Sequence, residues 1–186
     1  MKPANAVRLR ARVIGVAEPL RQCAAHHRHL PRCAGGLIGI EVVRVDTGWP
    51  CAWGIVGRPV ARVLAADGWV ELTRGICPQG APPGSASCVI AAAARWAKEQ
   101  SRPIVSYTLS CEPGTSYRAA GWIEVPIARQ PPQRQWGCSS RPRPERQGVI
   151  AASKRRWVSK ASFDAAVARG WMPPAVDGQA AIEDER

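Results

Sequence analysis

The sequence lacks any long apolar run. No stretch approaches the roughly 20 consecutive apolar residues that a membrane-spanning helix needs. The N-terminal residues also lack the apolar core of a secretory signal peptide. We therefore expect a cytoplasmic protein that has no membrane partner.

Closely spaced cysteines are missing as well. The chain has seven cysteines, an odd number, and no Cys-x-x-Cys pair. A disulfide framework or a zinc ribbon shows even numbers and tighter spacing. We expect most of these thiols to stay reduced and to serve as small core residues.

Acidic residues are scarce, above all near the C-terminus. The chain has 26 Lys and Arg against 14 Asp and Glu, a net charge of +12. The segment from Pro126 to Lys160 contains nine basic residues and one acidic residue, Glu145. This balance favours a polyanionic partner. We divide the chain into a compact domain, 1–126, and a basic, Pro-rich extension, 127–186, which has a helix at 162–169 and packs at least partly on the domain.

Apolar residues in the compact part follow alternating strand and helix periods. The two β-rich segments at 36–43 and 50–64 are separated by hairpin-turn residues, Asp46 to Gly48. The pattern predicts an α+β domain with a mixed sheet and no internal repeat. The remaining predicted elements are a strand at 7–14, a helix at 17–30, a strand at 68–76, a helix at 85–100, a strand at 103–110, and a short helix, glycine turn and strand over 115–125.

The stretch "ICPQGAPPGSAS", residues 76–87, places two glycines and three prolines before the helix at 85–100. A helix N-terminus exposes about four unpaired amides and roughly half a positive charge, which suits phosphate oxygens. Because proline has no amide proton, the donors are Gly84, Ser85, Ala86 and Ser87. The same residues also fit an ordinary turn with Ser85 as the N-cap. The stretch is either a phosphate site or a plain helix start.

The order of strand, glycine loop, long helix, strand and "SYRAAGW" resembles the second half of the fold of the GNAT superfamily of N-acetyltransferases. A closer resemblance is to Mom-like phage DNA-modification proteins. It rests on "HHRH" at 26–29, "GWVELTRGI" at 68–76, "GSASCVIAAAARWAKEQ" at 84–100 and "IVSYTLSCEPGTSYRAAGW" at 104–122. The resemblance implies a mixed, mostly antiparallel sheet flanked by helices. It also implies that residues 84–87 hold acetyl-CoA or another acyl-CoA, although Ala81 occupies the usual Arg or Gln position of the GNAT loop.

Proteins of the Mom-like family modify adenine in duplex DNA and shield phage DNA from restriction enzymes. For this chain, the resemblance implies an acyltransferase-like transferase of a bacterial host's cytoplasm, with DNA carrying a flipped-out base as its partner. One alternative is a nucleic-acid-binding protein that keeps a GNAT-like scaffold without catalysis. Another is an acetyltransferase that acts on a protein or a small molecule.

Four residues are candidates for the chemistry. Arg74 can bind a phosphate or a carbonyl, or simply pair with Glu71. Tyr117 occupies the position that often protonates the leaving thiolate in acetyltransferases. Leu109 stands where Mom carries an aspartate, and Glu112 can substitute for it. His27 can take a proton from the acceptor amine.

A metal is the alternative role for the histidines. Cys23, His26, His27, His29 and Cys33 include soft ligands, and iron dependence has been suspected in Mom. No single helical face collects four of these side chains, so we assign no metal site.

Nucleic-acid contacts are expected from the basic extension. Its Lys and Arg can neutralise phosphates, and its tryptophans can stack on an exposed base. A solvated tail is the alternative interpretation. The assigned residues are Arg141, Arg143, Arg146, Lys154, Arg155, Arg156, Trp136 and Trp157.

Overall fold

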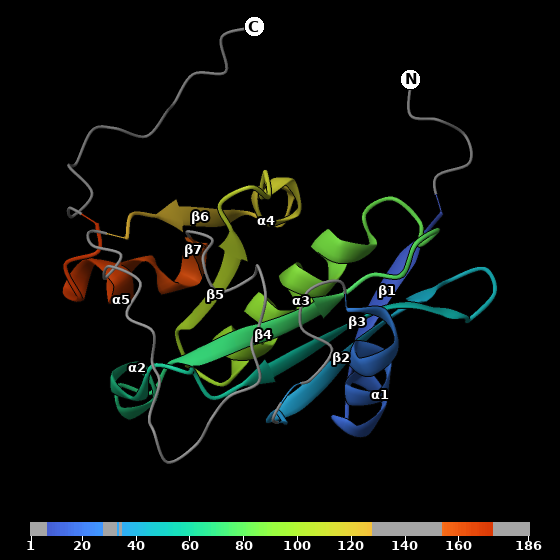
Figure 1. Cartoon of the computed structure of the whole chain (residues 1–186), viewed down its shortest axis with the longest axis horizontal. Helices are drawn as coiled ribbons and strands as arrows, with labels where there is room; N and C mark the ends of the chain where they lie inside the picture. The colour runs from blue at the N-terminus through green and yellow to red at the C-terminus, as the bar shows by residue number, and fades with distance from the viewer. Residues whose placement is uncertain (1–6, 28–32, 34, 128–153, 173–186) are drawn as a thin grey trace, which may run out of the picture.

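A seven-stranded sheet forms the centre of the computed structural model of the chain, which describes residues 7–27, 33, 35–127 and 154–172 (Figure 1). The strand order is β1-β2-β3-β4-β5-β7-β6. Only β4 and β5 are parallel, and every other neighbouring pair is antiparallel. The predicted α+β class with a mixed, mostly antiparallel sheet is confirmed. The strands are β1 (Leu9–Ile14), β2 (Ile38–Arg44), β3 (Pro50–Gly57), β4 (Val70–Ile76), β5 (Ile104–Leu109), β6 (Trp122–Val125) and β7 (Lys154–Ser159).

Helices cover both faces of the sheet, as Figure 1 shows. Two of them, α3 (Ser85–Glu99) and α4 (Thr115–Ala119), lie on what we call the α3 face. The opposite face, the α1 face, packs against α1 (Ala17–His26), α2 (Arg62–Ala66) and α5 (Phe163–Ala168). A single 3-10 turn, η1 (Lys160–Ser162), precedes α5. No helix in the described ranges is both long and apolar enough to cross a bilayer.

The side chains of the strands alternate between these two faces, as the pleat of a sheet requires. Ile40 and Val42 of β2 are fully buried beneath α3, in a cluster that includes Val89 and Ala93. Trp53 and Ile55 of β3 belong instead to the cluster around Cys23 of α1. This alternation tells us on which face each candidate residue lies.

One element differs from the sequence prediction within the β-rich segment 50–64. Strand β3 ends at Gly57, and residues 62–66 form the short helix α2. Pro59 lies two residues after the strand and cannot donate a ladder hydrogen bond, so the pairing cannot continue through it. The helix then buries Leu64 against Trp69 and Val158. The β-rich assignment of residues 62–64 was therefore wrong.

The basic extension contributes a strand to the interior of the sheet. Strand β7 pairs with β5 on one side and with β6 on the other. In its "KRRWVS" the last three residues are buried, and Trp157 and Val158 lie on opposite faces. The helix expected at 162–169 is present as η1 and α5. The fold thus joins residues from both parts of the sequence division.

Candidate functional site

The parallel strands β4 and β5 separate halfway along their length. They pair only from Val70 to Leu72 and from Ile104 to Ser106. Beyond this point β4 continues beside β3, whereas β5 continues beside β7, and Figure 1 shows the two strands diverging. We call the opening between them the β4–β5 split. Candidate residues on both faces of the sheet lie on the strands that border it.

A chain of hydroxyl groups closes the narrow end of the split on the α3 face. Buried Ser106 donates from its Oγ to the carbonyl oxygen of Leu72, 2.8 Å away. The hydroxyl of Tyr117 lies 2.7 Å from the same Oγ. Because serine has only one hydroxyl proton, Tyr117 must be the donor in the second bond. The phenol oxygen of Tyr117 thus keeps its lone pairs available as acceptors.

Tyr117 is held in place by aromatic packing. Its ring stacks on Trp157 with centroids 5.1 Å apart and meets the ring of Trp122 edge-on at 5.5 Å. Burial raises the pKa of Tyr117 to about 12, against the lowering effect of its bond to Ser106. The phenol is therefore protonated throughout the neutral range, which suits a hydrogen-bond donor and general acid.

Gly114 makes this packing possible. It begins α4 with a left-handed backbone, φ 71°, and a Cβ there would overlap the ring of Trp157. An L-residue at this position would be strained by its backbone and would displace the indole.

The loop before α3 begins the helix with glycine, not with serine. Gly84 is the N-cap, with φ 87° and an exposed backbone. No described residue accepts a hydrogen bond from the amides of Gly84, Ala86 or Ser87. The amide of Ser85 donates to the carbonyl of Pro82 at 3.1 Å. Three of the four predicted donors are thus available for an anion at this end of α3.

The two serines of the loop have different surroundings. Ser85 is 1% exposed and its hydroxyl donates to Pro82, 2.7 Å away, so this side chain belongs to the fold. Ser87 sits nearer the surface and donates to the carbonyl of Gly84 at 2.9 Å, which leaves its oxygen free to accept. The predicted N-cap hydrogen bond of Ser85 is not formed. Its hydroxyl points back into the loop instead.

Arg74 and His27 lie on the α1 face, across the sheet from Tyr117. Arg74 pairs with Ile55, which packs around Cys23 of α1, and its Nη1 donates to the Thr73 carbonyl at 2.6 Å. His27 follows α1 directly and is partly buried. The four predicted catalytic residues therefore do not form one cluster, because Arg74 and His27 lie across the sheet from Tyr117.

Glu71 and Tyr107 are candidate functional residues that sequence reasoning missed. Glu71 of β4 is 8% exposed, and its Oε2 accepts from the Val60 amide at 3.1 Å. Burial raises the pKa of this carboxyl, while the nearby charges of Lys154 and Arg74 act against that. Burial also raises the pKa of Tyr107, on the same face of β5. An acid between the apolar residues Val70 and Leu72 of a predicted strand was the available signal, and it was interpreted only as a partner of Arg74.

Glu112 lies in the turn after β5. Its Oε2 accepts from the amide of Leu109 at 3.3 Å, so the carboxylate helps to shape this turn. Its negative charge is one of the influences that raise the pKa of Tyr117. Glu112 is therefore close enough to act on Tyr117 electrostatically.

The described members of the predicted nucleic-acid set are divided between the two faces. Lys154 pairs with Leu109 and Arg156 pairs with Tyr107 across β5 and β7, and both basic side chains lie on the α1 face. Arg155 pairs with Thr108 and lies on the α3 face. Arg156 covers the ring of Trp171 at 3.8 Å, a cation–π contact. Arg141, Arg143, Arg146 and Trp136 lie outside the described residues.

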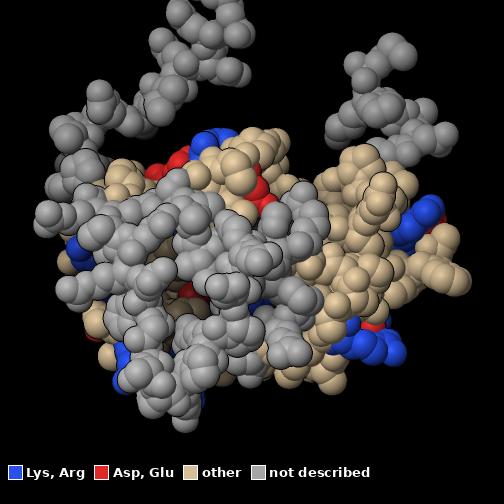
Figure 2. Space-filling model, viewed as in Figure 1, with Lys and Arg blue, Asp and Glu red and all other residues tan. Residues whose placement is uncertain are grey.

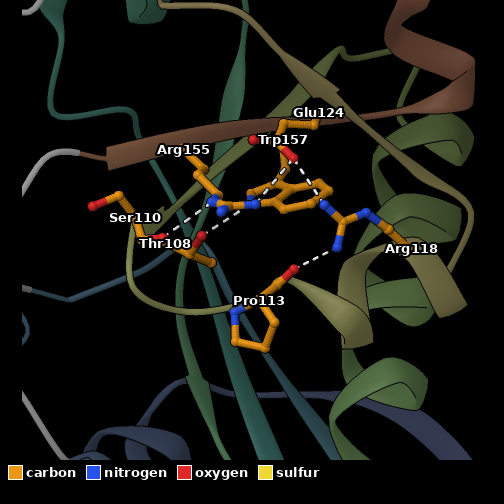
Figure 3. Close-up of polar contacts among 7 residues, drawn as sticks. All are labelled: Thr108, Ser110, Pro113, Arg118, Glu124, Arg155 and Trp157. Carbon is orange, nitrogen blue, oxygen red and sulfur yellow. Dashed lines mark hydrogen bonds and ion pairs between the residues drawn. The ribbon is translucent and has the colours of Figure 1, made fainter.

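Arg155 and Trp157 belong to a network that Figure 3 displays. Glu124 accepts from Arg118 at 3.0 Å and from Arg155 at 3.4 Å, above the indole of Trp157. Trp157 is fully buried, and its Nε1 donates to Thr108 at 3.0 Å. Its ring is enclosed by the core and does not present a face to a base. The expected stacking role does not fit Trp157, because pairing of β7 inside the sheet places this side chain beneath α4.

Metal ligands do not gather in the described part of the chain. Cys23 and Cys33 flank the α1 face, but His29 lies outside the described residues. Among the described residues, no group of three or more His, Cys, Asp or Glu is arranged to hold an ion.

The arrangement as a whole combines three chemical elements. Free amides at α3 fit phosphate oxygens, a protonated phenol lies at the β4–β5 split, and a buried carboxylate lies on the other face. The amides can bind a phosphate-bearing molecule. The phenol can donate a proton on the α3 face, and the carboxylate can accept one on the α1 face. No protein-family model and no curated protein matches this sequence.

Proposed function

We propose that the chain is a GNAT-like acyltransferase that modifies a base in DNA. The observation that carries this proposal is the position of the unpartnered amides of Gly84, Ala86 and Ser87 at the start of α3, on the same face as Tyr117 at the β4–β5 split. An acyl-CoA carries its phosphates at one end and its thioester at the other, and the proposal assigns these two ends to the amides and to Tyr117. The open space around Gly84, where even a Cβ would meet only ordinary contacts, fits the approach of a pyrophosphate.

Acetyl-CoA or another acyl-CoA would supply an activated acyl group. The amides of residues 84–87 would bind its pyrophosphate, and Ser87 would add a hydroxyl. Tyr117 would turn its proton from Ser106 to the sulfur and protonate the thiolate as it leaves. Glu71, whose pKa is raised by burial, would take the proton from the attacking exocyclic amine. Arg74, on the same face as Glu71, would bind the acceptor.

A nucleic-acid acceptor is supported by charge and by resemblance. The net charge of +12 favours a polyanion, and the four motif stretches resemble Mom-like proteins. The proposed role is the protection of phage DNA against host restriction. The base to be modified would have to leave the helical stack to reach the split.

A binding protein without catalysis is the second candidate. It is favoured by one specific observation: the Tyr117 proton is already engaged by Ser106 in a packed aromatic cluster. A tyrosine with only a structural role would show the same hydrogen bond and the same packing. The two candidates differ in whether Tyr117 matters for chemistry or only for packing.

Mass spectrometry of nucleosides tests the proposal directly. DNA from cells that express the protein should contain a nucleoside with the mass of an acyl adduct, absent from cells that express Tyr117→Phe. Titration with an acyl-CoA should show saturable binding that Gly84→Ala weakens. Unchanged nucleosides together with tight, salt-sensitive DNA binding would favour the second candidate. Activity without nucleic acid would favour acetylation of a protein or small molecule.

A further inference from the structure

An exposed tryptophan borders a groove at one end of the sheet. The groove has a volume of about 400 Å³ and lies between the β2–β3 hairpin and the loop after β4. Trp49, in the hairpin, is 73% exposed, the largest exposure of any described tryptophan. Leaving an indole in water is unfavourable, so a partner that covers it would gain from its burial. The groove is lined by Arg44, Thr47, Trp49, Pro50, Cys51, Trp53 and residues 78–82.

Positive charge surrounds this end of the sheet. The amide of Arg44 donates to the carbonyl of Trp49 across the hairpin, and the amide of Val45 donates to the carbonyl of Arg8. Trp49 therefore lies opposite Arg44 across the hairpin, and Arg8 directly precedes the neighbouring edge strand β1, with its side chain on the other face of the sheet from Arg44. The guanidinium of Arg44 is paired with Asp46 at 2.6 Å, whereas no described acid lies within ion-pair distance of Arg8.

The arginines continue along the edge strand β1. Arg8, Arg10 and Arg12 alternate with side chains that pack beneath α3, so all three lie on one side of the strand and are exposed. At about 3.3 Å per residue this row extends roughly 13 Å, more than one nucleotide occupies along a strand. Arg12 is paired with Glu41 at 2.7 Å, but Arg10 has no acidic partner among the described residues. Figure 2 shows basic side chains at this end of the molecule.

We propose that the groove binds an unpaired base of a DNA strand, stacked on Trp49, and that the strand then crosses the sheet edge at β1, where Arg8 and Arg10 contact the adjacent phosphates. The proposal rests on the proposed function, because it takes DNA as the partner, and it names the surface that holds the strand. A volume of about 400 Å³ is large enough for one nucleotide unit. The charge that continues beyond the groove favours a polymer over a single small molecule. Aromatic stacking is tolerant of sequence, since every base has a π-face.

Edge protection is the alternative reason for arginines on β1. Charged side chains on an edge strand prevent it from pairing with another chain. That role explains exposed arginines but not the exposed indole beside the groove. It also predicts that the arginines affect aggregation and not affinity for DNA, so binding measurements separate the two.

Fluorescence anisotropy with a labelled DNA strand of about 20 nucleotides, single-stranded or fully paired, tests the proposal. Trp49→Ala should weaken single-strand binding about 5- to 150-fold, while Trp49→Phe retains most of the affinity. The effect on the paired duplex should be small, because its bases are not available. Arg8→Ala with Arg10→Ala should lower the magnitude of the salt slope by about 1.4 for the single strand. Arg95→Ala, an exposed arginine on α3, is the control and should not produce this loss.

The outcomes separate this inference from the proposed function. If wild-type protein binds neither form of DNA, then DNA is not its partner, and both the proposed function and the groove assignment are wrong. Wild-type binding that Trp49→Ala leaves unchanged would overturn the groove assignment alone. If Trp49→Ala weakens binding of acyl-CoA but not of DNA, the groove belongs to the cofactor and the inference is wrong. Because Trp49 is 73% exposed, its replacement leaves the core intact.

Discussion

The hydroxyl of Tyr117 donates its proton to the Oγ of Ser106, 2.7 Å away, because Ser106 uses its own proton on the carbonyl of Leu72. This order of donors links α4 to both strands of the β4–β5 split. Tyr117 is thereby oriented before any ligand arrives. Its position depends on a residue that belongs to the core and not to the surface.

Tyr117→Phe should separate chemistry from packing. The ring can still stack on Trp157, and the loss of one hydrogen bond should cost about 1 kcal/mol in the free energy of unfolding. If the phenol protonates the leaving thiolate, acyl transfer should fall about 100-fold or more. Nucleoside mass spectrometry and urea denaturation provide the two measurements. Full activity in this variant would show that Tyr117 is structural.

Ser106→Ala should change the pKa of Tyr117 while leaving the tyrosine itself in place. The bond to Ser106 lowers the pKa of Tyr117, because the serine proton can turn from the Leu72 carbonyl to the phenolate oxygen, so its removal should raise that pKa further. Ultraviolet titration of tyrosinate, with Tyr107→Phe as the background, measures the change. A positioning role for Ser106 predicts reduced acyl transfer in Ser106→Ala. An unchanged titration would show that Ser106 does not stabilise the phenolate of Tyr117.

The two serines of the α3 loop should respond differently to replacement by alanine. Ser85→Ala removes a buried hydrogen bond to Pro82 and should reduce the free energy of unfolding by about 1–2 kcal/mol. Ser87→Ala should change stability little but weaken acyl-CoA binding, because its oxygen can accept from the ligand or its proton can turn to a phosphate. Thermal denaturation and calorimetric titration of both variants decide the matter. If Ser87→Ala binds acyl-CoA normally, the role assigned to its hydroxyl is wrong.

Much of the fold was predictable because its elements carry local signals. The helix beginning at Ser85 and the strand from Ile104 have clear periods, and Gly84 marks the start of the helix. The strand β7 was not predicted, because "KRRWVS" is dominated by charge when it is considered alone. Its strand character depends on pairing with β5, about 50 residues earlier in the chain. Such long-range pairing leaves little trace in local composition.

The candidate site was only partly predictable for the same reason. The sequence indicated Tyr117 and the α3 loop, which lie on one face of the sheet. It could not show that Arg74 lies on the other face, since a bulge between Ile55 and Val56 changes the alternation of β4. Nor could it show that Glu71 is buried, because that depends on which segments cover the α1 face.

Replacing Gly114 should test the packing of Tyr117 independently of chemistry. Gly114→Ala combines a left-handed backbone with overlap on the ring of Trp157, and we expect destabilisation of more than about 2 kcal/mol. Gly80→Ala is the matched control: its φ is also positive, 85°, but the space around it is open. It should cost only the backbone strain, about 1 kcal/mol. Equal losses in urea denaturation would show that the indole can move aside.

Glu71→Gln should reveal the buried carboxyl through the pH dependence of stability. Burial raises the pKa of Glu71 in the folded state, so folding favours the protonated form. The stability that this proton provides is fully present below the unfolded pKa, about 4.5, and is lost as pH rises through the folded pKa. Glutamine keeps an oxygen for the Val60 amide and has no charge to bury. The stability of Glu71→Gln relative to wild type should therefore be greater at neutral pH than near pH 4, as urea denaturation at both pH values can measure.

Glu99→Gln, at the exposed end of α3, is the control for the loss of one negative charge, and it should not show this difference. The same Glu71→Gln variant should lose acyl transfer, because its amide cannot take a proton from the acceptor amine. A gain in stability at neutral pH combined with a loss of activity is the pattern of a group that is retained for chemistry at a cost to folding. An identical stability difference at both pH values would mean that the carboxylate is ionised in the folded protein without penalty. Glu71 would then be no candidate for a base that works near neutrality.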